Sequence, residues 1–240
     1  MSELILVRHG QSIWNLQNRF TGWYDVDLSD NGLSEAKKAG ELLVKKNIRI
    51  DFAYTSYLKR ANSTLKIILE NMKLENIGFT KSWEFNERHY GSLTGLNKSE
   101  MKEQLGEEKI KIYRRSWDIA PPELSEDSEF NPRNDIIYKG INVDAIPNTE
   151  SLKDTYDRVI PYFNINIRPK ILAGKNVIIA AHGNSLRALC KLLFNISNEN
   201  INKLEIPTGN PLLVKLDSDL KFISAYYLDE IRAQTIIQNK

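Results

Sequence analysis

The sequence predicts an α/β fold: a mostly parallel central sheet with helices on both faces and an inserted helical and loop cap at about residues 91–148. Two apolar stretches, residues 4–7 and 177–181, have the composition of strands buried on both faces. Segments with helical periodicity alternate with strand-like segments almost throughout, which is typical of a parallel sheet covered by helices. Each stretch runs into a His-Gly pair, at the carboxyl end where ligand sites of such sheets lie.

The first predicted helix is recognised from its spacing and its cap. Residues 30–46 place apolar side chains at helical intervals, with Ser29 as the N-cap and Asp30 at the positive end of the helix dipole. A polar and aromatic loop with one short helical turn precedes it. The remaining elements are expected in this order: a strand at 51–56, a helix at 58–72, a strand at 79–85, helices at 98–105 and 107–117, a helix at 151–168 with a kink or break at Pro161, the strand at 176–181, a helix at 185–195, and strands at 211–216 and 222–228.

Two segments fall outside this alternation. Residues 91–148 have too few apolar side chains for a core of their own, so we expect them to form an insertion packed over the sheet, within one domain of residues 1–240. Residues 229–240 form a short tail. Ile231, Ile236 and Ile237 are expected to lie on one face of a short helix that docks against the pocket rim, since a free tail would expose them.

Composition excludes several classes of function. The net charge of +2 over 240 residues gives no general field for nucleic acid or for a membrane surface. The single cysteine, Cys190, rules out an intramolecular disulfide and a multi-cysteine metal site. No apolar run approaches membrane-spanning length, and the N-terminus lacks the pattern of a signal peptide. These features lead us to expect a cytoplasmic protein.

The polar residues near the strand ends suit a small substrate with several negative charges. If the two apolar strands are neighbours, His9 and His182 face each other across one pocket. A neutral imidazole at His9 is a competent nucleophile toward phosphorus, and the adjacent Arg8 favours the neutral form. His182 would stabilise the transferring oxygens, and Glu87 would serve as general acid and base. The other residues in this group are Asn15, Thr21, Arg60, Arg114, Arg115 and Asn184.

Structural interpretations compete with this one for individual residues. A single strand-end histidine is more often structural than catalytic, and His89 is expected to be structural or a minor wall of the site. Taken alone, Arg60 is as compatible with a surface position as with a role in the site. Arg114 and Arg115, taken alone, are more typical of a solvent-exposed face than of a binding site. Three histidines without a pair at i, i+4 spacing argue against a zinc site.

Several motifs closely resemble the phosphoglycerate mutases that depend on 2,3-bisphosphoglycerate. The Arg-His-Gly motif alone would indicate only the wider histidine phosphatase superfamily, whereas the Thr-Gly-Trp and Glu-Arg-His-Tyr-Gly segments point to the mutases. The resemblance covers nearly the whole chain. The matching segments are residues 6–12, Asn15, 19–23, 58–61, 86–91, 95–98 and 181–187, extended by 113–115, 121–122, 158–161 and 206–209.

The resemblance implies a role for each matching residue. His9 would carry the phosphoryl group, Glu87 would donate and accept the proton, and His182 would stabilise the transition state. Those implied around the phosphoryl group are Arg8, Asn15, Arg60 and Gly183. Those implied for the rest of the substrate are Ser12, Thr21, Gly22, Arg88, His89, Tyr90, Lys98, Arg114, Arg115 and Asn184.

The implied reaction interconverts 3-phosphoglycerate and 2-phosphoglycerate in glycolysis and gluconeogenesis. It would use 2,3-bisphosphoglycerate as the phosphoryl primer and no metal, in a possible homodimer or homotetramer. The alternative function is that of a phosphatase or a bisphosphoglycerate-directed enzyme on the same fold. Ser12 and Thr21-Gly22, which match the mutases, argue against a bisphosphoglycerate synthase. A non-catalytic binder would need the loss of His9, Glu87 or Arg60, and all three are present. The sequence departs from the family at residues 229–231, where a glycine-bearing turn is usual.

Overall fold

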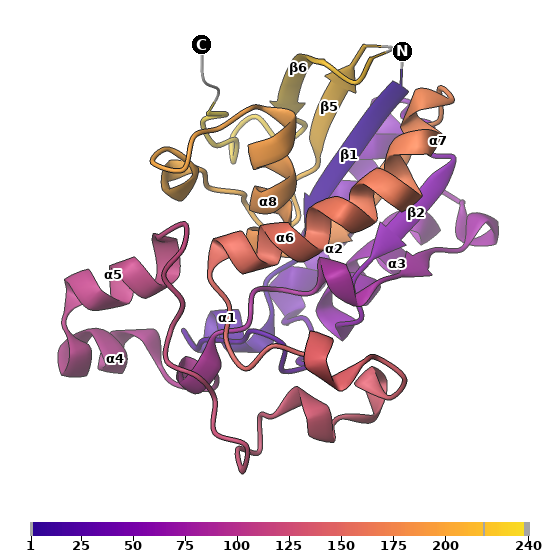
Figure 1. Ribbon diagram of the computed structural model, residues 1–240. Helices are drawn as coiled ribbons and strands as arrows, with labels where there is room; N and C mark the ends of the chain where they lie inside the picture. Colours follow the sequence, from indigo (N-terminus) through magenta and orange to yellow (C-terminus); the bar gives the residue numbers. More distant parts are fainter. Residues whose placement is uncertain (1, 218, 238–240) are drawn as a thin grey trace.

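The computed structural model describes residues 2–217 and 219–237, and a six-stranded sheet lies at its centre (Figure 1). The strand order is β3-β2-β4-β1-β5-β6. The pairs β3–β2, β2–β4 and β4–β1 are parallel, whereas β5 runs antiparallel to both β1 and β6. The predicted mostly parallel sheet is therefore confirmed. The strands are β1 (Ser2–Arg8), β2 (Phe52–Thr55), β3 (Thr80–Lys81), β4 (Val177–Ala181), β5 (Leu212–Leu216) and β6 (Phe222–Tyr227).

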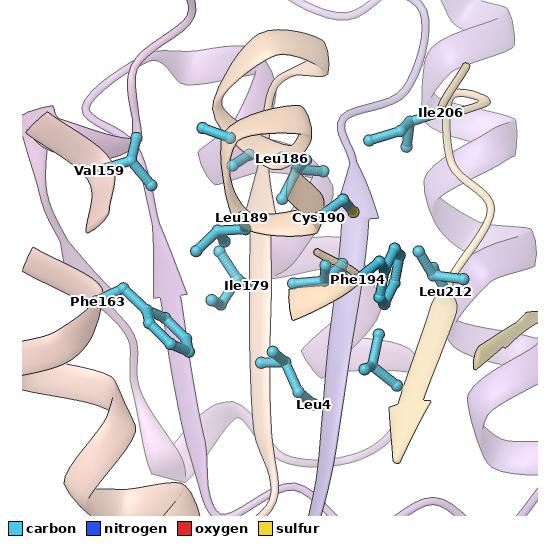
Figure 2. Packing of buried hydrophobic residues seen from close by; sticks show 14 of the residues in the cluster. Leu4, Val159, Phe163, Ile179, Leu186, Leu189, Cys190, Phe194, Ile206 and Leu212 are labelled. Carbon is cyan, nitrogen blue, oxygen red and sulfur yellow. The ribbon is translucent and has the colours of Figure 1, made fainter. Parts of the chain in front are cut away.

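Helices cover both faces of the sheet, which explains the uninterrupted apolar sequence of its two central strands. On one face, Ile5 and Ile178 pack against α2 (Asp30–Lys45) and α3 (Lys59–Asn71). On the other face, Leu4 and Ile179 lie beneath α6 (Leu152–Tyr162) and α8 (Gly183–Leu193), as Figure 2 shows. Successive strand residues point to opposite faces, so each central strand needs apolar side chains at every position.

The predicted helix at 151–168 is longer than expected and contains an irregular turn. α6 leads into a π-helical segment, Phe163–Ile167, and then into α7 (Arg168–Leu172). Pro161 lies inside α6 and has no amide hydrogen to donate. The helix nevertheless continues past Pro161, and the π-helical segment begins two residues later.

The predicted strand at 79–85 was too long. β3 contains only Thr80–Lys81, and a 3₁₀ turn at Trp83–Phe85 follows directly. The Ser82 amide still donates to the Thr55 carbonyl at 2.9 Å, but the Ser82 hydroxyl turns back onto the Glu84 carboxylate. This local hydrogen bond ends the strand at the edge of the sheet.

The insertion at 91–148 is fastened to the loop that follows β1. It contains α4 (Lys98–Leu105), α5 (Glu107–Arg115) and several 3₁₀ turns. Phe20 from the loop is buried with Met101 and Ile110 of the insertion, and Trp23 is buried with Tyr138. In Figure 1, α4 and α5 lie beside α1 (Ile13–Leu16), close to the carboxyl end of β1. The insertion thereby brings cationic residues to that end of the sheet.

The predicted tail helix was wrong. Residues 229–237 contain no helical segment, and Ile231 is 95% exposed. Ile236 and Ile237 pack against the larger core cluster, while residues 238–240 of the predicted tail lie outside the described residues. Instead, Arg232 fastens the start of the tail. Its guanidinium donates to Asp229, to Glu35 and to the carbonyls of Thr208 and Gly209.

Replacing Arg232 with alanine should lower the free energy of unfolding by about 1–3 kcal/mol, because two buried or half-buried carboxylates lose a charged donor. The Asp229 and Glu35 side chains are only 4% and 14% exposed. Urea denaturation measures the change. Lys66→Ala is the matched control: its partner, Glu70, is solvated, so we expect a change within about 0.5 kcal/mol. Equal losses in the two variants would contradict this role of Arg232.

Candidate active site

A cavity of about 150 Å³ opens at the carboxyl ends of β1 and β4. Its described walls carry seven lysine or arginine side chains and two carboxylates, Glu87 and Glu205. This excess of cations suits a ligand with several negative charges. The lining residues are Arg8, His9, Asn15, Arg19, Thr21, Gly22, Arg60, Glu87, Tyr90, Lys98, Arg114, Arg115, Gly183, Asn184, Arg187 and Glu205.

The sheet register brings two histidines together at this cavity. Arg8 and Ala181 are paired across the parallel strands β1 and β4, and the His9 amide donates to the Ala181 carbonyl at 2.9 Å. The imidazole centroids of His9 and His182 are 4.8 Å apart, with an interplanar angle of 62°. His9 lines the cavity, whereas His182 is fully buried behind it.

His9 is held as a neutral imidazole with one nitrogen free. Its Nδ1 lies 2.7 Å from the Gly10 carbonyl oxygen, which can only accept, so Nδ1 carries the proton. Burial lowers the pKa of His9 well below its usual value, and Arg60 and Arg8 lower it further. The Nε2 lone pair is therefore available at neutral pH.

His182 is also kept neutral. Burial lowers its pKa well below the usual value, with further contributions from Arg60 and His9. Its Nε2 shares a 2.8 Å hydrogen bond with the Ser56 hydroxyl, which also accepts from the Leu58 amide. Its buried Nδ1 has no hydrogen-bond partner among the described residues. One nitrogen of His182 is thus anchored while the other is left for a ligand.

Arg8 and Arg60 are fixed by backbone carbonyls rather than by carboxylates. Arg60 donates to the carbonyls of Gly22 and Tyr24 at 2.8 and 3.0 Å, and Arg8 donates to Ile206 at 2.9 Å. Burial lowers the pKa of Arg60 to about 10, so it remains a cation at neutral pH. The buried Nε of Arg8 has no partner among the described residues. Positive charges held in this way remain available to a bound anion.

Glu87 presents one carboxylate oxygen to the site and uses the other as an anchor. Its Oε1 accepts from the amides of Arg88 and Asn184 at 2.8 and 3.1 Å. Its Oε2 lies beside Gly183, where an added Cβ would be 3.7 Å away from it. The first turn of α8 therefore orients Glu87 toward the same space as Arg8, which is 3.6 Å from that Cβ position.

The insertion closes one side of the cavity with Lys98 and Arg114, and Tyr90, which directly precedes the insertion, lines the same side. The Lys98 amide donates to the Asn18 carbonyl at 2.8 Å, and burial lowers the pKa of the Lys98 ammonium. Burial alone would raise the pKa of Tyr90, but the guanidinium of Arg88, 4.8 Å from the Tyr90 ring, lowers it on balance. Burial thus shifts the pKa of Lys98, whereas a neighbouring cation decides the shift at Tyr90.

Comparisons with known proteins agree with this arrangement. The sequence pattern of the histidine phosphatase superfamily, branch 1, matches residues 4–142 and 126–228. A 2,3-bisphosphoglycerate-dependent phosphoglycerate mutase of Pelagibacter ubique (strain HTCC1062) is 53% identical over 237 residues, covering 99% of each chain. The enzyme of the same name from Maricaulis maris (strain MCS10) is 50% identical over 98% of each chain. The chain belongs to the phosphoglycerate mutases of the histidine phosphatase superfamily.

Solved structures of two phosphatases share the fold at low sequence identity. A mycobacterial glucosyl-3-phosphoglycerate phosphatase in complex with VO3 has a TM-score of 0.72 at 20% identity, covering 95% of this chain and 97% of that one. A putative α-ribazole-5'-phosphate phosphatase from Escherichia coli has a TM-score of 0.67 at 17% identity over 94% of each chain. Within the described residues, no helix has the length and apolar character needed to cross a membrane.

Three residues that the mutase resemblance assigned to the substrate do not line the cavity: Ser12, Arg88 and His89. Ser12 caps α1, where its hydroxyl accepts from the Asn15 amide while its own amide donates to the Asn15 side chain. Arg88 lies behind Tyr90 and donates to the Arg114 carbonyl. His89 is buried, and its Nδ1 accepts from the Gly91 amide. Ser12 and Arg88 thus hold two lining residues of this mutase, Asn15 and Arg114, whereas His89 fixes the backbone at Gly91.

Conversely, Arg19, Arg187 and Glu205 line the cavity although the sequence analysis did not assign them to it. Arg19 and Arg187 lie within segments that match the mutases, and Arg187 follows Asn184 by three residues on the same face of α8. The spacing from Asn184 could therefore have assigned Arg187 to the cavity. No sequence pattern could have assigned Glu205, because contacts with residues distant in sequence position its loop.

Acid should destabilise this mutase. Burial lowers the pKa values of His9 and His182 and takes that of His89 to about 3, so all three stay neutral in the folded state. The unfolded chain takes up protons below about pH 6.5, so stability is full above that pH and falls below it. The loss is about 1.4 kcal/mol per histidine per pH unit, or roughly 4 kcal/mol at about pH 5.5 relative to pH 7.5. Urea denaturation at both pH values checks this, and equal stabilities would contradict it.

Proposed function

We propose that this protein interconverts 3-phosphoglycerate and 2-phosphoglycerate in glycolysis and gluconeogenesis through a phosphohistidine at His9. The observation that carries this proposal is the neutral His9, whose Nε2 is free in a cavity with seven cations. The names of the two relatives, at 50–53% identity over nearly the full chain, support the same reaction. A location in the cytoplasm, where glycolysis runs, and a homodimer or homotetramer belong to this proposal.

In the first half-reaction, His9 Nε2 attacks a phosphorus atom of 2,3-bisphosphoglycerate and the bond to the glycerate oxygen breaks. Glu87 delivers a proton to that leaving oxygen. In the second, Glu87 removes the proton from a substrate hydroxyl, which attacks the phosphoryl group and regenerates the free imidazole. The proton returns to the same carboxylate, so the cycle balances.

The transferring phosphoryl group would be held by donors already aimed at the cavity. Arg8, Arg60 and Asn15 supply side-chain N–H groups, and the first turn of α8 at Gly183 adds its positive dipole end. With Ser56 donating to its Nε2, His182 would carry its proton on Nδ1 and donate it to a phosphoryl oxygen. These donors need little rearrangement in the transition state.

The remainder of the substrate would be held at the other end of the cavity by side chains or backbone groups from the loop after β1, from Tyr90 and the insertion that follows it, and from α8. Because 2,3-bisphosphoglycerate carries two phosphates and a carboxylate, these groups match its second phosphate and its carboxylate. They are Thr21, Gly22, Tyr90, Lys98, Arg114, Arg115 and Asn184, with the addition of Arg19 and Arg187.

We expect turnover to be insensitive to chelators. The charge of the transferring group would be met by arginines, and no cluster of three or more His, Cys, Asp or Glu side chains suited to a metal ion occurs within residues 2–217 and 219–237. Activity with and without EDTA is the measurement. A loss of activity that manganese restores would contradict a reaction carried by His9 and the arginines alone.

The competing functions are a phosphatase or bisphosphoglycerate-directed enzyme on the same fold, and a non-catalytic phospho-ligand binder. A coupled assay for 2-phosphoglycerate formation, with and without added 2,3-bisphosphoglycerate, separates them. A mutase forms 2-phosphoglycerate and is activated by the bisphosphate. A phosphatase releases inorganic phosphate in preference, and a binder does neither.

A further inference from the structure

Glu205 is a carboxylate in a cavity that otherwise attracts anions. Its Oε1 lies 2.5 Å from Arg115 Nη2 and its Oε2 lies 3.2 Å from Arg187 Nη2. Glu87 is the other carboxylate among the described lining residues, and backbone amides anchor it beside Gly183. The proposed reaction gives Glu87 a proton to move, whereas it gives Glu205 no task.

The backbone around Glu205 is fixed from both sides. The Leu204 carbonyl accepts from Arg187 Nε at 2.7 Å, and the Ile206 carbonyl accepts from Arg8 Nη1 at 2.9 Å. The Glu205 carbonyl accepts from the Tyr227 hydroxyl at 3.3 Å. Its side chain, in contrast, is 46% exposed, so the carboxylate can leave the arginines for water while its backbone stays in place.

The two arginines do not depend equally on Glu205. Arg187 also donates to the Asn184 side chain and to the Leu204 carbonyl, so it keeps its position without Glu205. Arg115 has a second donor, Nη1, that is buried without a partner among the described residues. A substrate acid group at this end of the cavity would therefore meet one arginine already in place and another with a free donor.

We propose that Glu205 is an internal counter-anion, which occupies the position on Arg115 and Arg187 that the non-transferred acid group of the substrate takes on binding. This inference rests on the proposed mutase function and adds a selectivity residue to it. A ligand with two acid groups displaces the Glu205 carboxylate and binds both arginines with its second acid group. A ligand with one acid group, held at His9, leaves the carboxylate in place and gains neither.

Glu205→Gln tests this proposal, because the amide keeps an acceptor for the arginines but removes the charge. Calorimetric titration with 3-phosphoglycerate measures binding without turnover, since the unphosphorylated enzyme cannot transfer a phosphoryl group to it. We expect about fivefold or tighter binding at low ionic strength and a smaller gain at high salt, where charges are screened. Inorganic phosphate should bind within about twofold of wild type. Asp157→Asn, which removes the same charge from the solvated pair with Lys153, should leave both affinities unchanged.

Three outcomes would overturn the counter-anion role. Weaker binding of 3-phosphoglycerate to Glu205→Gln would make Glu205 a positioning residue for Arg115. Unchanged binding would leave it without influence on the ligand. An equal gain for inorganic phosphate would show a general field rather than competition at one end of the cavity. A wild-type protein that binds no 3-phosphoglycerate would instead contradict the proposed mutase function, so the two failures are distinguishable.

Discussion

His9→Ala should abolish phosphoglycerate mutase turnover, with kcat falling by about 10⁴-fold or more, because a covalent nucleophile has no substitute in the mechanism. The same variant should lose the acid-labile phosphoryl label that 2,3-bisphosphoglycerate leaves on the wild-type protein. We do not expect His182 to replace it, since with Ser56 donating to its Nε2 the proton of His182 is on Nδ1, and neither nitrogen offers a free lone pair. The coupled assay and acid-quenched labelling measure both effects.

The control for His9→Ala is binding. The cationic walls of the cavity remain in the variant, so 3-phosphoglycerate should still bind with a dissociation constant within a few-fold of wild type. Loss of binding together with turnover would indicate a damaged cavity rather than a missing nucleophile. Full labelling of the variant would contradict our assignment and move the nucleophile elsewhere, with His182 the next candidate.

Glu87→Gln should slow both half-reactions by about 10²-fold or more while changing substrate affinity little. The amide oxygen can still accept from the Arg88 and Asn184 amides, so the side chain should keep its place. What is lost is the ability to give a proton to the leaving oxygen and to take one from the attacking hydroxyl. Rapid-quench measurement of phosphoenzyme formation and decay resolves the two steps.

Glu84→Gln is the matched control for Glu87→Gln. Glu84 lies three residues earlier in the same segment, contacts Ser82 and does not line the cavity. We expect its kcat to stay within about twofold of wild type, since the same chemical change then touches no reacting group. If Glu87→Gln behaved in the same way, Glu87 would be a structural carboxylate and another group would move the proton.

Most of the fold was predictable because its central strands are buried on both faces. Leu4 and Ile5 are neighbours in the sequence but belong to core clusters on opposite faces of the sheet. An uninterrupted apolar run therefore indicates a strand that is covered on both faces. The edge strand and the tail were predicted less well. Side-chain hydrogen bonds decide them: Ser82 with Glu84 ends β3, and the ion pairs of Arg232 replace the expected tail helix.

The site was predictable where chemistry coincides with a strand end or a helix start. His9 and His182 follow strands that pair in register, so their juxtaposition depends only on the sheet order. Glu205 illustrates the opposite case. It lies in a loop held by Arg8, Arg187 and Tyr227, which are distant in sequence, and no spacing along the chain records those contacts.

Site mapping of the phosphoenzyme tests the central claim most directly. The wild-type protein, mixed with 2,3-bisphosphoglycerate and quenched within one turnover, would be digested under alkaline conditions that preserve phosphohistidine, and its peptides analysed by mass spectrometry. Our account predicts a single phosphoryl group on His9, formed at least as fast as kcat. A phosphoryl group on His182 or on another side chain, or one formed more slowly than turnover, would contradict it.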